Sequence, residues 1–210
     1  SITCVDDSAH LVLDNTVWIQ GGDATFEFGS ITFLNEVEFI GSHTFAYESS
    51  QTSTIATKST WSIRDGITLK DGRSSPSGVT PLYFQDGSSI LEIDNASLFV
   101  SDHGMQITNG MLLFNRNVTI EMVSTSTENG LELGNGITEN NPVLQINPGA
   151  AVNFVSGHFT YNITNSGNLK SFTNTARIAR GADSVFYIQE SLVLPEVTVR
   201  PSPYATIVVA

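Results

Sequence analysis

A strand-and-turn pattern that returns about 81 residues later constrains the fold of this chain more than any other feature. Residues 11–15 (LVLDN) return as residues 91–95 (LEIDN). With Ala96 taken as a one-residue insertion, later positions also match: Val17 and Ile19 with Leu98 and Val100, Phe26 with Ile107, Gly29 with Gly110, and Val37 and Phe39 with Val118 and Ile120. A chain built by repetition favours an elongated solenoid over a globule folded around one pocket.

Apolar residues recur as short i, i+2 pairs, which is typical of strands with one face turned inward. The pairs expected to face inward include Leu11/Leu13, Val17/Ile19, Phe26/Phe28, Ile31/Phe33, Leu91/Ile93 and Leu112/Phe114. Tight-turn residues such as Asp-Asn and Gly-Gly separate them, and no window of a dozen residues keeps a helical period. The sequence therefore predicts an all-β, single-domain parallel β-helix (β-solenoid) of short strands with irregular loops.

We divide the chain into three parts. Residues 1–164 form the solenoid coils, with repeat copies at about 11–70 and 91–163, and the second copy carries about ten extra residues around 125–141. Residues 165–183 are expected to be an irregular loop, and residues 184–210 a partial third repeat with a C-terminal strand. That strand is uncharged and apolar, so it either packs on the domain or pairs with another subunit. In the second case Tyr204, Ile207, Val208 and Val209 are the candidate subunit-interface residues.

Composition excludes several classes of partner. Only 14% of the 210 residues are charged, and nine Lys and Arg against 21 Asp and Glu give a net charge of −12. Without clustered cations, binding to nucleic acid or to an anionic membrane surface is disfavoured, and no apolar stretch is long enough to span a membrane. The polar, weakly charged composition suggests a secreted protein, extracellular or at a cell surface, and the start at Ser1 fits either a removed export signal or a trimmed chain. Cys4 is the only cysteine, either an incidental thiol or the site of an intermolecular bridge.

The sequence carries no catalytic constellation. The four histidines are scattered without zinc spacing, and nucleophile-elbow, phosphate-loop and dinucleotide motifs do not occur. We therefore predict no catalytic residue, cofactor or metal. Arg64-Asp65 and the 71–73 segment (DGR) come nearest to a lyase site and are interpreted as solvated turns. Trp18, between Val17 and Ile19, is predicted to face outward as a surface contact for a glycan or a neighbouring subunit, and Trp61 to lie in the core.

The glycine-punctuated short strands of residues 88–122 (SSILEIDNASLFVSDHGMQITNGMLLFNRNVTIEM) resemble the right-handed β-helices of bacterial surface proteins and autotransporter passengers. The resemblance covers about residues 11–163 and implies an adhesin, stalk or matrix role, although some members carry hydrolytic or lyase sites. Fragments of the polygalacturonase pattern occur at 6–7 (DD), 103–104 (HG) and 177–178 (RI), but that family's Asn-Thr-Asp element is missing.

The function expected from these observations is that of a secreted structural, self-assembling β-solenoid. Such a protein would be a subunit of an extracellular fibre or surface layer, binding itself head to tail or by strand exchange. Two alternatives stay open. A polysaccharide-active enzyme predicts carboxylates from adjacent coils that converge in a groove beside residues 71–81 or 125–141. A glycan-binding adhesin predicts an exposed aromatic patch near Trp18.

Overall fold

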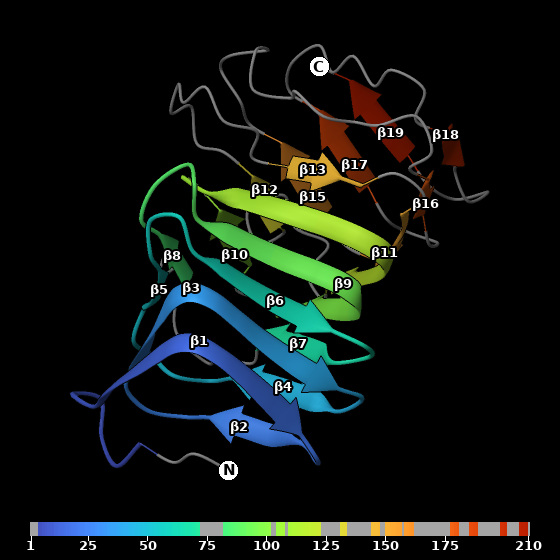
Figure 1. Cartoon of the computed structure of the whole chain (residues 1–210). Helices are drawn as coiled ribbons and strands as arrows, with labels where there is room; N and C mark the ends of the chain where they lie inside the picture. Colours follow the sequence, from blue (N-terminus) through green and yellow to red (C-terminus); the bar gives the residue numbers. More distant parts are fainter. Residues whose placement is uncertain are drawn as a thin grey trace.

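The chain folds as a stack of parallel strands in a computed structural model, which confirms the predicted β-solenoid (Figure 1). The structure describes residues 4–71, 82–101, 104–107, 109–122, 131–133, 144–147, 150–156, 158–161, 177–180, 185–188, 198–200 and 206–209. These residues contain no helix, and every strand pairing among them is parallel.

The strands vary from three to twelve residues in length. In chain order they are β1 (His10–Gln20), β2 (Ala24–Phe26), β3 (Ser30–Gly41), β4 (Thr44–Tyr47), β5 (Ser53–Ile55), β6 (Thr60–Arg64), β7 (Thr68–Asp71), β8 (Leu82–Phe84), β9 (Ile90–Val100), β10 (Met105–Ile107), β11 (Met111–Met122), β12 (Leu131–Leu133), β13 (Leu144–Ile146), β14 (Ala151–Ser156), β15 (His158–Tyr161), β16 (Arg177–Arg180), β17 (Val185–Ile188), β18 (Thr198–Arg200) and β19 (Thr206–Val209).

The pairings define three faces. The first face stacks the first halves of β1 and β3 with β5 and β8, and the sheet β10-β12-β15-β17-β19 continues it where β10 contacts β8. The second face stacks the second halves of β1 and β3 with β6, the first halves of β9 and β11, and β13. The third face stacks β2, β4 and β7 with the second halves of β9 and β11, then β14, β16 and β18.

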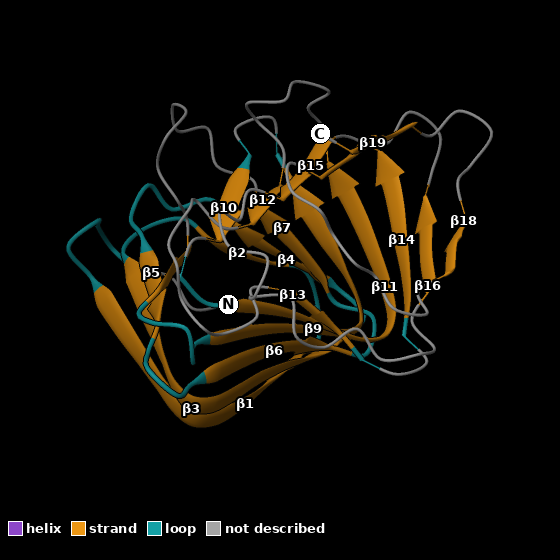
Figure 2. Cartoon of the chain, turned by 90° about the horizontal axis from the view of Figure 1, so that it is seen from above, coloured by secondary structure: helices purple, strands orange, loops and turns teal. Residues whose placement is uncertain are grey.

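Long strands bend where one face meets the next, as Figure 2 shows for β1 and β3. A single residue in the left-handed region lies at each bend: Asn15 in β1 (φ 44°) and Asn35 in β3 (φ 55°), between the first and second faces, and Asn95 in β9 (φ 51°) and Arg116 in β11 (φ 57°), between the second and third. Asparagine tolerates this conformation better than most residues because its short amide makes local hydrogen bonds. Asp14 joins two stacked bends, since its Oδ1 accepts hydrogen bonds from the side-chain amides of Asn15 (3.0 Å) and Asn35 (2.6 Å).

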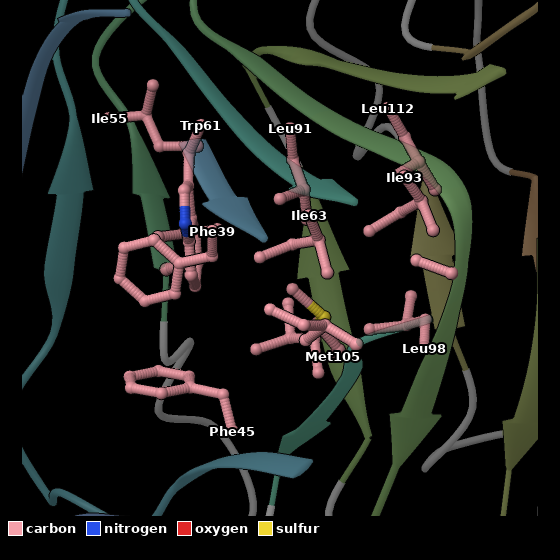
Figure 3. Close-up of a cluster of buried hydrophobic side chains, with 14 of the residues drawn as sticks. Phe39, Phe45, Ile55, Trp61, Ile63, Leu91, Ile93, Leu98, Met105 and Leu112 are labelled. Carbon is pink, nitrogen blue, oxygen red and sulfur yellow. The ribbon is translucent and has the colours of Figure 1, made fainter. Parts of the chain in front are cut away.

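Inward residues form columns because each strand lies in register on the one before it. On the second face, one column joins Val37, Trp61, Leu91 and Leu112, and its neighbour joins Phe39, Ile63, Ile93 and Phe114. All eight are buried, and Trp61 is 2% exposed, as predicted for a core residue. The Trp61 ring stacks on Phe33 with the ring centroids 4.2 Å apart. Figure 3 shows six members of these columns, Phe39, Trp61, Ile63, Leu91, Ile93 and Leu112, in one cluster with Phe45, Leu98 and Met105.

The 81-residue repeat relates strands on two different faces. Leu11 and Leu13 pair with Ile31 and Phe33 on the first face, whereas residues 91–93 lie in register with residues 61–63 on the second. The two copies are also not separate units, because β6 of one pairs with β9 of the other. What the copies share is local: a short strand, an Asp-Asn bend and a second strand.

The predicted orientation of Trp18 is wrong, and so is that of its two neighbours. Val17 and Ile19 are 57% and 81% exposed, whereas Trp18 packs against the core and stacks on Phe39 at 5.6 Å. The error came from treating Ala96 as an insertion. Without that gap Asn15 still matches Asn95, but Trp18 matches the buried Leu98, and a one-residue slip in a strand exchanges its two faces.

Three further expectations differ from the structure. Phe28, expected inward, is 41% exposed. The segment 165–183, expected to be irregular, contains β16, and the extra residues around 125–141 contain β12. The loop residues 72–81, His103 and Tyr204 lie outside the described residues.

Candidate functional site

The first coil that the structure describes is made by β1 and β2. β1 pairs with β3 and β2 pairs with β4, and no strand of the described residues pairs with the opposite edge of either (Figure 1). The edge of β1 is long, because this strand has eleven residues. An edge of that length offers a row of backbone donors and acceptors to an incoming parallel strand.

The outer side of β1 is apolar where the next coil is mostly polar. Val12, Val17 and Ile19 are all at least half exposed. The residues in register with them on β3 are Thr32, Glu38 and Ile40, respectively. Exposed apolar side chains beside a strand edge without a described partner are typical of a surface that binds another protein chain.

The last strands that the structure describes are β18 and β19. β18 pairs with β16 and β19 with β17, and the described residues include no strand beyond either. Three of the predicted interface residues, Ile207, Val208 and Val209, therefore lie in the last strand of the first face. The pairing of β19 with β17 agrees with the first of the two roles predicted for this segment, packing on the domain, and pairing with another subunit stays a prediction.

Charge is distributed unevenly between the two ends. The first 57 residues contain eight acidic residues and neither Lys nor Arg. Residues 163–210 contain four basic residues and three acidic ones, and the basic ones are Lys170, Arg177, Arg180 and Arg200. The N-terminal coils are therefore strongly acidic, whereas the C-terminal part is close to neutral.

A second polar feature lies on the outer side of the second face. Arg64 of β6 contacts Glu38 of β3 (Nη1–Oε1 3.2 Å) and Glu92 of β9 (Nη2–Oε2 2.9 Å). Ser62 donates a hydrogen bond to the same oxygen of Glu92 at 2.6 Å. These side chains and Glu36 line a groove of about 220 Å³. Beside it, Arg116 of β11 contacts Asp94 and Asp65.

Both arginines stay protonated in this cluster. Partial burial lowers the pKa of Arg64, but the hydrogen bond to Glu92 and the charges of Glu92, Glu38 and Asp94 outweigh it, so the net shift is upward. The pKa of Arg116 is raised chiefly by its hydrogen bonds to Asp94. Carboxylates from neighbouring coils thus converge here, and Arg64 and Arg116 pair with four of them, Glu38, Asp65, Glu92 and Asp94. Arg64 belongs to a strand, so its interpretation as part of a solvated turn is wrong.

The other chemistry-bearing side chains are dispersed. His10 hydrogen-bonds Ser30 and Thr32, and His43 lies 3.9 Å from Asp23. Cys4 is a free, partly buried thiol packed against the core. The described part of the chain brings no three His, Cys, Asp or Glu side chains together as a metal site, and it holds no helix with the length and hydropathy to cross a membrane.

Comparison of the chain with protein-family models, with curated proteins and with solved structures gives no match.

Proposed function

We propose that this protein is a structural, self-assembling β-solenoid, a subunit of an extracellular fibre or surface layer. The observation that carries the proposal is the edge of β1 that no described strand pairs with, and the exposed Val12, Val17 and Ile19 beside it. The charge-poor, hydroxyl-rich composition supports a location outside the cell.

The geometry of a solenoid makes such assembly directional. Each coil stacks on the previous one through parallel backbone hydrogen bonds, and a second copy can extend the stack in the same way. A contact between the first coil of one copy and the last coil of another joins two different surfaces. Contacts of this heterologous kind produce open filaments unless the rotation closes a ring.

The test compares two lysine substitutions in one row of the first face. Val12 and Thr32 are in register on β1 and β3, so V12K places a charge on the open edge and T32K places the same charge one coil further in. Sedimentation velocity over a concentration series and negative-stain microscopy should show assemblies for the wild type and T32K, and monomers for V12K. A wild-type protein that stays monomeric throughout contradicts the proposal.

A polysaccharide-active enzyme is a second candidate, and the groove between Glu38, Arg64 and Glu92 is the observation that favours it. The test is incubation with neutral and acidic polysaccharides, followed by chromatography of the products, with E92Q as the control variant. No released oligosaccharide rejects this candidate. A glycan-binding adhesin has less support, because Trp18 packs against the core; a glycan array without hits rejects it.

A further inference from the structure

We infer that the groove on the outer side of the second face binds an extended peptide segment that carries a lysine or arginine beside apolar side chains. The groove lies over β3, β6, β9 and β11, which follow one another in the stack of strands (Figure 1). The inference goes beyond the proposed function, because it concerns a partner of different sequence and does not depend on self-assembly.

The groove is lined by two rows of residues that lie in register across these strands. One row consists of Glu36, Thr60 and Ile90, and the other of Glu38, Ser62, Glu92 and Leu113. Neighbouring strands lie about 4.8 Å apart, so the groove extends about 14 Å from β3 to β11. Its chemistry changes along that length, from two carboxylates on β3, through two hydroxyls on β6, to the aliphatic side chains of β9 and β11. The groove is therefore acidic at one end and apolar at the other.

The ion pairs inside the groove leave one of its carboxylates without a cation. Arg64 contacts Glu38 at 3.2 Å and Glu92 at 2.9 Å, and the Glu92 side chain is only 9% exposed. Glu36 is exposed, and its carboxylate forms no ion pair or hydrogen bond with another described residue. Three carboxylates and one guanidinium line the groove, which gives it a net charge of −2. A cation bound at Glu36 would balance part of that charge.

The surroundings of the acidic end favour a cation as well. A second hollow of about 170 Å³ shares Glu36 and Glu38 with the groove, and Asn15 and Val17 complete its lining. The first 57 residues, which include all four of these side chains, contain eight acidic residues and neither Lys nor Arg. The field of this part of the chain attracts positively charged partners and repels negatively charged ones.

An extended peptide matches both ends of the groove. Side chains two residues apart in an extended chain project to the same side, about 6.7 Å from each other. A lysine or arginine over Glu36 therefore places the side chain two or four residues further along over Ile90 and Leu113. The aliphatic part of the basic side chain covers the hydroxyls of β6 while its charge stays at the carboxylates. A neutral polysaccharide brings no cation to Glu36 and no alkyl group to Leu113.

The test measures the binding of short fluorescent peptides to the full chain by fluorescence anisotropy. The probe repeats the unit Lys-Ser-Val-Ser, which sets every lysine and valine on one side of an extended chain. Replacing each valine by serine removes the apolar contacts and should weaken binding about fivefold. Replacing each lysine by glutamate should abolish binding, because like charges then meet at Glu36.

Two charge reversals on the protein locate the site. E36K should weaken binding of the probe about tenfold, because it removes an attraction and adds a repulsion. E48K is the matched control, since Glu48 is an exposed acid directly after β4 and lies outside the groove. It changes the net charge of the protein equally, and screening should limit its effect on affinity to less than about twofold at physiological salt. Circular dichroism establishes that both variants retain the fold.

Three results would overturn the inference. The first is a wild type that does not bind the probe. The second is equal weakening by E36K and E48K, because the peptide would then respond to the overall charge of the protein and not to the groove. The third is binding of a chitosan oligosaccharide in place of the peptide, which would make the ligand a cationic sugar. None of these results bears on the self-association measured with V12K and T32K.

Discussion

The inward orientation of Trp18 predicts which residue of β1 stabilises the fold. Trp18→Ala removes an indole that stacks on Phe39 and lines a small apolar space with Leu13, Phe26 and Phe45. Ile19→Ala removes an adjacent side chain that is 81% exposed. The two substitutions therefore separate the two faces of one strand.

The magnitudes follow from burial. Removing a fully buried tryptophan costs about 3–5 kcal/mol, and Trp18 is only partly buried on a coil with one neighbour, so we expect a loss of about 2 kcal/mol in unfolding free energy. The same loss lowers the melting temperature of a chain of this size by about 4–8 °C. Ile19→Ala should change the unfolding free energy by less than about 0.5 kcal/mol.

Urea unfolding followed by tryptophan fluorescence and circular dichroism measures both values. The substitutions are made in a V12K background, so that self-association does not add to apparent stability. If Ile19→Ala lowers the unfolding free energy more than Trp18→Ala does, then Ile19 and not Trp18 faces the core, and the orientation of β1 after the bend at Asn15 is wrong.

Three other outcomes are expected. Arg64→Ala leaves the carboxylate of Glu92 without its cation and should lower the unfolding free energy by about 2–3 kcal/mol in urea titrations, with part of the loss recovered in the double variant with Glu92→Gln. Asn95→Ala should cost about 1 kcal/mol in the same assay because of its positive φ, whereas Asn95→Gly should be close to neutral; equal losses would contradict a conformational cause. Hydrogen bonds from Ser88 and Thr57 lower the pKa of Asp86 below its ordinary 3.8, so the stability it contributes is present above that value and lost as the pH falls through the lower folded pKa. Unfolding curves from pH 5 to 2 should therefore fall more steeply for the wild type than for Asp86→Asn.

The fold class was predictable because alternation and turn chemistry act locally. Pairs such as Ile31/Phe33 and Leu91/Ile93 identify inward positions within one strand, and both pairs are buried. Alternation within one strand does not tell which residues face inward after a bend. A left-handed residue resets the alternation, so the inward residue after Leu13 is Thr16, three positions on and polar in type, and a search for apolar residues passes over it.

The polar cluster and the neighbours of β2 were harder to predict. Glu38, Arg64 and Glu92 lie on three different coils, and the spacing between them depends on coil lengths that vary along the chain. The pairing of Asp23 with Thr44 likewise depends on the register of β2 with β4. One signal was available without any structure: the absence of Lys and Arg from the first 57 residues.

The bends carry a consequence for how such a chain can lengthen. Residues 11–15 turn the chain from the first face to the second, and residues 91–95, nearly the same sequence, turn it from the second to the third. A strand–bend–strand segment is therefore portable between corners of the coil. A duplicated stretch of the gene therefore need not encode a whole number of coils. A strand–bend–strand segment copied from one bend of the coil can fold at a different bend.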